Sequence, residues 1–311
     1  MFFHESRTAH KSLSKIFDFV WPTLAAMWNL RWQVSGFLAN HTNASEADLE
    51  ARFIRGSHIH GANLRRTCQE VSWKEHELFL GRLLLIDVFA LYEGWAISVL
   101  GALHSNTKAH LTGLQYPASS AARTNVATVL AALTSTESRV LRDSFYPVLI
   151  KSRFVSGAHL DAMLSCYRFF KEIRNCLVHS DGIADQRLLD AYNLFARVAT
   201  PEGLGVKMVP QHDVPILGMR HTVHLRGIVG FTQVVLRLIA TIDAELSRSI
   251  RAESYLRHEW SLTHGRRFTL KTRDADARSR QVARLFIKLG LPAPVHTNGL
   301  ELWLRSEHLV G

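Results

Sequence analysis

The sequence predicts a mainly α-helical protein of 311 residues. Three observations indicate this class. Apolar residues recur at helical spacing through most of the chain. Residues 74–103 are apolar nearly all round, as in a helix that is buried on most sides. Short stretches typical of strands occur only after residue 205. We expect a helical bundle over residues 76–255, an N-terminal helical region over residues 1–75 and a small basic α/β segment over residues 256–311.

The N-terminal region predicts helices with an irregular connection. Apolar spacing indicates a helix around residues 13–24, which Pro22 should kink or end. Ser45, followed three residues later by Asp48, is an N-cap pattern for a short helix that runs to about residue 56. Three tryptophans lie close together, which is typical of a core, with a binding role as the alternative: Trp21, Trp28 and Trp32.

The central region predicts one long helix over residues 74–103, which carries Asp87 and Glu93. A carboxylate inside such a helix needs a partner, and Arg174 is a candidate. Gly182 is well placed to end the helix that bears Arg174. Further helices are expected over about residues 123–145, 158–181, 184–198 and 228–251. Short strands are expected at residues 206–209 and 222–225.

The C-terminal segment predicts strands at residues 268–270 and 300–304 on either side of a helix over residues 275–289. Cationic side chains gather in its first half, and they indicate either an RNA-binding surface or a solvated helix face. The residues expected to bind RNA are Arg266, Arg267, Lys271, Arg273, Arg280, Arg284 and Lys288.

Composition narrows the class of protein and its partners. The net charge is +10, which indicates a polyanionic partner. Of the 37 basic residues 28 are Arg, whose guanidinium groups grip phosphate with paired bonds, and the alternative is that this Arg bias reflects genome composition. Three cysteines without a CxxC pattern fit reduced thiols in a cytoplasm. The longest uncharged stretch of an apolar region, Gly94–Thr107, is too short to span a bilayer, so no membrane contact is expected. His58 and His60 lack acidic or Cys neighbours at ligand spacing, and no Walker or GxGxxG pattern occurs, so we expect neither metal nor cofactor.

The stretch FFKEIRNCLVHSDG, residues 169–182, carries the strongest functional pattern. Asn175 and His179 are four residues apart and share a helix face with Lys171. Arg174 and His179 are five apart, so their directions differ by about 140° on a helix. Two copies that meet across a symmetry axis would pool two Arg and two His side chains in one cleft. An imidazole near a helix end and a fixed guanidinium suit proton transfer and phosphate binding.

This stretch resembles the core motif of the HEPN superfamily, an Arg, a polar residue, further residues and then a His on a helical bundle. The resemblance covers roughly residues 75–255, including a long preceding helix with an internal acid such as Glu93. It implies a metal-independent endoribonuclease, in which His179 is general base or acid and Arg174 clamps the phosphate. Asn175 would orient the histidine or hold the RNA sugar. Glu93 and Lys171 would support them.

The resemblance also implies RNA as the partner, a homodimer, and a role as a toxin or phage-defence effector that an inhibitory or antitoxin protein restrains. The alternative is a HEPN-like interaction or scaffold module that binds a protein or nucleic-acid partner without cutting. In that reading Arg174 pairs with Glu93 or Asp87, and His179 caps carbonyls at the helix end.

Overall fold

The computed structural model describes residues 1–105, 107–120, 122–265, 268–270 and 274–310, and this part of the chain is mainly helical. The predicted class is therefore confirmed. The α-helices are α1 (His4–Asn40), α2 (Glu46–Phe53), α3 (Trp73–Ala102), α4 (Lys108–Gly113), α5 (Val126–Leu133), α6 (Arg139–Ser144), α7 (Tyr146–Leu149), α8 (Leu160–His179), α9 (Gln186–Ala196), α10 (Pro201–Leu204), α11 (Leu225–Leu246), α12 (Ile250–His264), α13 (Ala275–Lys288) and α14 (Thr297–Ser306). Two short helices of other types are η1 (Arg66–Glu70) and η2 (Gly157–His159).

All four predicted strands are wrong for the residues that the structure describes, which contain isolated β-bridges and no strand. The C-terminal segment is therefore helical there, and residues 300–304 lie within α14. Arg220 forms an isolated antiparallel bridge with Ile183, and His221 N donates to Gly182 O over 2.8 Å. The helix predicted over residues 123–145 is two shorter ones, α5 and α6. Helix α1 continues through Pro22.

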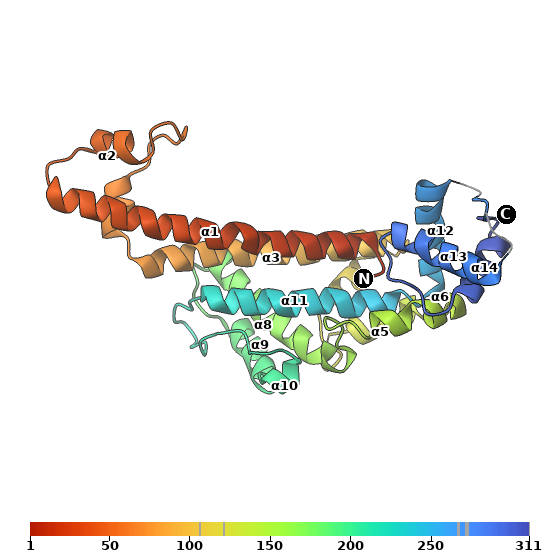
Figure 1. The fold of residues 1–311 in the computed structure, drawn as a ribbon. Coiled ribbons are helices and arrows are strands. Elements are labelled where there is room, and N and C mark those ends of the chain that lie inside the picture. Colours follow the sequence, from red (N-terminus) through yellow and green to blue (C-terminus); the bar gives the residue numbers. More distant parts are fainter. Residues whose placement is uncertain (106, 121, 266–267, 271–273, 311) are drawn as a thin grey trace.

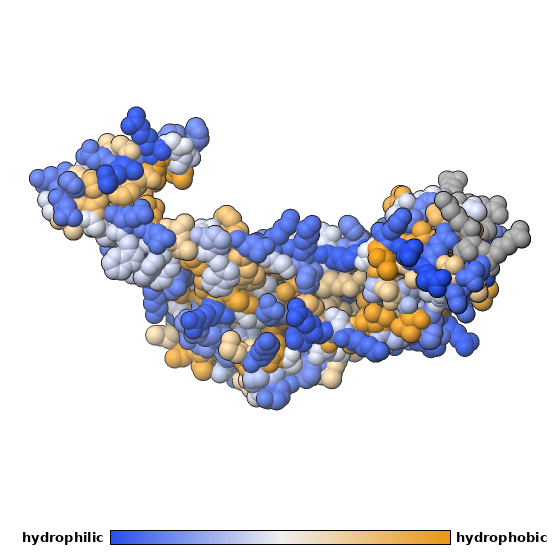
Figure 2. Space-filling model, in the orientation of Figure 1, coloured by the Kyte–Doolittle hydropathy of each residue, from blue (hydrophilic) through white to orange (hydrophobic). Residues whose placement is uncertain are grey.

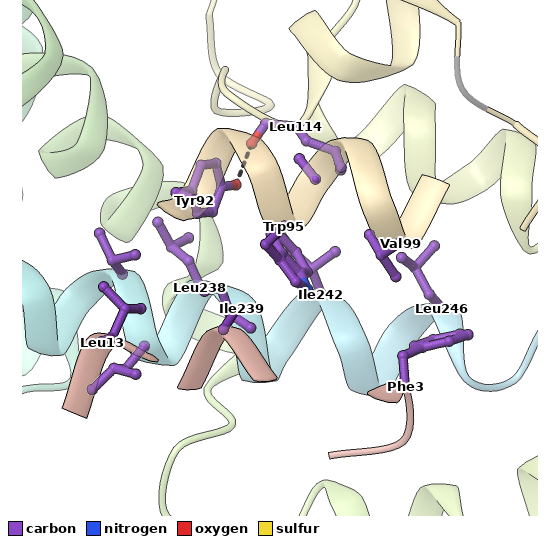
Figure 3. Packing of buried hydrophobic residues seen from close by; sticks show 14 of the residues in the cluster. Phe3, Leu13, Tyr92, Trp95, Val99, Leu114, Leu238, Ile239, Ile242 and Leu246 are labelled. Atoms are coloured by element: carbon purple, nitrogen blue, oxygen red, sulfur yellow. Dashed lines mark hydrogen bonds between the residues drawn. The ribbon is translucent and has the colours of Figure 1, made fainter. Parts of the chain in front are cut away.

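Helices α1, α3 and α11 run side by side along the length of the molecule, with α8 and α9 beside them (Figure 1). Ser72 and Glu75 form a capping box that begins α3. The core between these helices is closely packed (Figure 3). Trp95 Nε1 donates to the buried Ser6 Oγ at 2.9 Å, and Tyr92 Oη donates to Leu114 O at 2.7 Å. Large buried side chains of α3 thus keep their polar atoms paired.

The first residues of the chain are anchored in this core. Phe2 and Phe3 have no exposed surface. Their backbone N–H groups donate to the two carboxylate oxygens of Asp243 on α11, at 2.6 and 3.0 Å. Burial raises the pKa of Asp243, and the donated hydrogen bonds oppose that rise. The start of the chain and α11 are therefore joined by both apolar packing and a buried polar contact.

The far end of α1 forms an arm with α2 and η1, and it projects from the body (Figures 1 and 2). A small second core holds the arm together. As predicted, Ser45 caps α2 in a capping box with Asp48. The expectation that the tryptophan cluster is core is wrong. Trp21, Trp28 and Trp32 are 47%, 43% and 66% exposed, because α3 and α11 cover other faces of α1.

Helices α3 and α11 are long and apolar enough to cross a membrane by length and composition alone. The most apolar part of α11 is 72% buried inside the protein, and that of α3 is 50% buried. Core helices of soluble proteins pass the same test, so absence of membrane contact stays a prediction. Helices α12, α13 and α14 lie at the opposite end from the arm (Figure 1).

Candidate functional site

Helix α8 and the turn after it position the candidate site. Ser180 N and Gly182 N both donate to Cys176 O at 2.9 Å, which ends the helix. Asp181 and Gly182 have φ of 50° and 82°, a left-handed conformation that glycine adopts without strain. Asp185 then caps α9 by accepting from Leu188 N at 2.9 Å. The short connection therefore lays α9 directly against α8.

Arg174 faces α3. Its guanidinium lies 3.6 Å from Glu93 Oε1 and 5.6 Å from the ring centroid of Phe89. Lys171 Nζ donates to the same Glu93 oxygen at 2.8 Å and also to Gln115 Oε1. The side chain of Arg174 remains 21% exposed. Glu93 therefore has the partners expected of it, whereas Asp87 is exposed to solvent and needs none.

Asn175 and His179 face the other way, into a hollow of about 360 Å³ between the end of α8 and the start of α9. Its remaining lining residues are Glu172, Cys176, Ser180, Asp185 and Arg187. Arg174 and Lys171 do not line it, so one chain does not bring the guanidinium of Arg174 into the pocket of His179. For Arg174 this divergence follows from its spacing to His179 on the helix. The expectation that Lys171 shares the face of Asn175 and His179 is wrong, because its long side chain reaches Glu93 on α3 instead.

Some side chains of the pocket are held by internal hydrogen bonds, and others are exposed to solvent. Asn175 Nδ2 donates to Glu172 Oε2 at 2.9 Å, and the other oxygen of this buried carboxylate pairs with Arg168. His179 is exposed, and its ring makes no hydrogen bond to the residues that the structure describes. Arg187 is likewise exposed and has no ion pair within the described chain. Both side chains can therefore contact a ligand without first losing an internal partner.

Cys176 is the other reactive group of the pocket. Its Sγ lies 3.9 Å from Asp185 Oδ1, and burial raises the pKa of the thiol. A protonated thiol is a poor nucleophile, so the chemistry of the pocket rests on the imidazole, the amide and the guanidinium.

Arg187 and Glu172 are the site residues that sequence reasoning missed. Glu172 was inside the motif stretch, four residues after Arg168, which is the spacing of an ion pair on a helix. Arg187 follows His179 by eight residues, and only the tight turn at Gly182 brings it back beside the helix.

The basic C-terminal residues lie apart from this pocket. Arg280, Arg284 and Lys288 are exposed on α13, at spacings that share one helix face. Helix α13 lies at the end of the molecule that also holds α12 and α14 (Figure 1). The other four residues expected to bind RNA, Arg266, Arg267, Lys271 and Arg273, lie outside the described residues.

Metal coordination has no obvious place in the part of the chain that the structure describes. No group of three or more His, Cys, Asp or Glu side chains there is arranged to hold a metal ion.

Comparison with protein families, with characterised proteins and with solved structures finds no match to this chain.

Proposed function

We propose that this chain is a metal-independent endoribonuclease that acts in the pocket between α8 and α9. The observation that carries the proposal is an exposed His179 imidazole with no hydrogen-bond partner among the described residues. It lies in one hollow with the anchored amide of Asn175 and the unpaired guanidinium of Arg187. The HEPN-like pattern of Arg174, Asn175 and His179 supports the same chemistry. Cytoplasmic RNA is the proposed substrate.

In this reaction His179 removes the proton from a ribose 2′-hydroxyl. The freed oxygen forms a bond to the adjacent phosphorus, the bond from phosphorus to the 5′-oxygen breaks, and that oxygen takes up a proton from water. The products are a 2′,3′-cyclic phosphate and a 5′-hydroxyl end. A guanidinium stabilises the added negative charge of the phosphorane, and Asn175 orients the imidazole or the sugar. DNA lacks the attacking hydroxyl and is not a substrate.

A second copy of the chain supplies the remaining groups of the site in this proposal. Arg174 lies where α8 meets α3, and α3 exposes apolar side chains at spacings of four and three residues beside that junction. Phe79, Leu83 and Ile86 are 65%, 51% and 38% exposed, and Val178 at the end of α8 is 40% exposed. Arg174 and His179 face opposite ways on α8, so the two-fold interface must include both this surface and the end of α8 to bring one Arg174 toward the His179 of the other chain.

The proposed cellular role is that of a toxin or phage-defence effector. An enzyme that cuts RNA in its own cytoplasm needs restraint, so an inhibitory or antitoxin protein is the expected partner. The exposed cations of α13 would hold the RNA backbone away from the cleavage point.

One observation favours a second function, that of a non-catalytic interaction or scaffold module. Glu93 already neutralises Arg174, and a half-buried ion pair between α3 and α8 is a sufficient structural role for that residue.

Cleavage assays in excess EDTA separate the two functions. We expect wild type and His258→Ala, an exposed control histidine on α12, to cut RNA alike. His179→Ala should lose activity by a factor of about 100 or more, the usual contribution of a general base. Comparing Arg187→Ala with Arg174→Ala, and with the exposed control Arg197→Ala, tells which guanidinium serves the phosphate. Product ends should carry the cyclic phosphate.

Equal cleavage by wild type and His179→Ala would mean a contaminating nuclease and would remove the support for the enzyme. No cleavage of structured or unstructured RNA by wild type would favour the scaffold module.

A further inference from the structure

A second hollow, of about 250 Å³, adjoins the pocket of His179. The two hollows share Glu172 and Arg187 as lining residues, so Arg187 stands at the boundary between them. Apolar groups line much of the second one: Tyr116 and Pro117 come from the loop after α4, and Ala191 and Leu194 come from α9. A polar pocket and a less polar one therefore meet at the guanidinium of Arg187, which has no ion pair within the described residues.

The walls of the second hollow are held in place. The guanidinium of Arg168 lies 4.3 Å from the ring centroid of Tyr116 and also pairs with the buried Glu172. The carboxylate of Asp161, on the first turn of α8, accepts the backbone N–H of Ser119 at 3.3 Å. The loop is thus tied to α8, and the guanidinium of Arg168 lies over the ring of Tyr116 beside the hollow that both residues line.

We propose that this second hollow receives a nucleobase of the bound RNA, whose phosphate lies at Arg187 in the pocket of His179. The hollow is lined by an aromatic ring and a guanidinium, the groups on which bases stack, beside apolar side chains. A base with a phosphate attached to its sugar matches an apolar hollow that opens into a polar one. The inference rests on the proposed function, which places the phosphate of the RNA in the pocket of His179. It identifies Tyr116 and Leu194 as residues that bind the substrate.

The test measures binding to the full chain by calorimetric titration with three probes: nucleoside 3′-monophosphates, the nucleosides alone and inorganic phosphate. Leu194→Trp should fill the hollow from an exposed position of α9. Asn193→Trp is its matched control, because Asn193 is exposed on the same helix and does not line the hollow. Tyr116→Leu removes the stacking ring by an independent route.

We expect the 3′-monophosphates to bind more tightly than either the nucleosides or phosphate. Leu194→Trp and Tyr116→Leu should each weaken the binding of the 3′-monophosphates about tenfold, which matches the free energy of stacking one base on an aromatic side chain. Phosphate binding should not change, and Asn193→Trp should behave as wild type. Equal affinity of all variants for the 3′-monophosphates, or monophosphates that bind no better than phosphate, would overturn the proposal.

RNA cleavage by the same variants separates this proposal from the proposed function. If wild type cuts RNA and Leu194→Trp cuts it equally well, the base site is wrong and the ribonuclease stands. If no variant cuts RNA but Leu194→Trp still weakens nucleotide binding, the base site stands and the enzyme does not.

Discussion

At the scale of single residues, Glu172 lines both hollows and holds other lining residues in place. A buried carboxylate is unfavourable unless its oxygens are paired. Here one oxygen pairs with Arg168 and the other accepts from Asn175 at 2.9 Å. All three residues belong to α8 and lie three or four positions apart, so the helix itself sets their geometry. The amide of Asn175 is consequently oriented before any substrate arrives.

His221 makes the stability of the fold depend on pH. It is 6% exposed, its Nε2 has no hydrogen-bond partner in the described chain, and burial lowers its pKa from the ordinary 6.5. The unfolded chain therefore binds the proton more readily, so this stability is complete above pH 6.5 and is lost as the pH falls below it. The neighbouring carboxylate of Asp213 opposes this effect, and His212 and His224 add to it.

We expect the free energy of unfolding, measured in urea, to fall between pH 7 and pH 5. It should fall less steeply in His221→Phe than in wild type. Some decline should remain, because burial also lowers the pKa of His10 and His264. Identical slopes for the two proteins would contradict a buried neutral imidazole at this position.

Sequence reasoning at this scale placed some residues correctly. Helical spacing is enough to put Asn175 and His179 on one face and to turn Arg174 away from them. It could not find Arg187, because that contact depends on how the chain turns after α8. It also placed Trp28 in a core, because a residue type alone does not tell which face of α1 the other helices cover.

At the scale of elements, two glycines let a loop pack against the start of α11. A Cβ added at Gly227 would collide with the carbonyl oxygen of Gln211, and one at Gly230 would come within 2.9 Å of Pro210 Cα. The next loop residue, His212, packs its ring 5.0 Å from that of Phe195 on α9. Close backbone contact at α11 thus positions a loop that also covers α9.

Gly227→Ala should therefore lower the free energy of unfolding by about 1–3 kcal/mol, as overpacking does. Gly94→Ala is the matched control, because a Cβ on that α3 residue meets nothing within 4 Å. The control should raise stability by about 0.5–1 kcal/mol through helix propensity. Urea unfolding of both variants beside wild type measures the two shifts, and equal stability of Gly227→Ala and wild type would disprove the close contact.

Most helices could be predicted because their apolar periodicity is long, as in α3, α8 and α11. The strands could not, because short alternating patterns are ambiguous. In residues 222–225 the alternation is real, since Val223 and Leu225 are buried and Thr222 and His224 both donate to Asp213. The described residues offer no strand beside it, so residues 222–224 form no ladder and Leu225 begins α11 instead. In α14, Leu300, Trp303 and Leu304 are buried at helical spacing instead.

At the scale of the whole molecule, the proposed dimer gives a direct test of the shared site. Arg174→Ala and His179→Ala should each be inactive alone. A mixture of the two should regain up to about a quarter of wild-type activity, because a heterodimer keeps one complete Arg174–His179 pair. Light scattering should report a dimer for every variant. Full activity in a strictly monomeric sample would exclude a composite site.

Whole-molecule arrangement was the level least accessible from sequence. The expected N-terminal region and helical bundle do not pack separately, because α1 packs against α3 and α11 over much of its length. The arm could not be foreseen, because its small core uses residues such as Val34 and Leu64 from distant parts of the N-terminal region.

The anchoring of Phe2 and Phe3 at Asp243 sets an order on biosynthesis. A ribosome must add some 240 further residues before the carboxylate that receives these two backbone groups exists. Until then the apolar side chains of α1 and α3 that pack against α11 remain exposed. Transiently exposed apolar surface of this kind is what makes unfinished chains need chaperones. The contact of Phe2 and Phe3 with α11 therefore forms only after Asp243 has emerged from the ribosome.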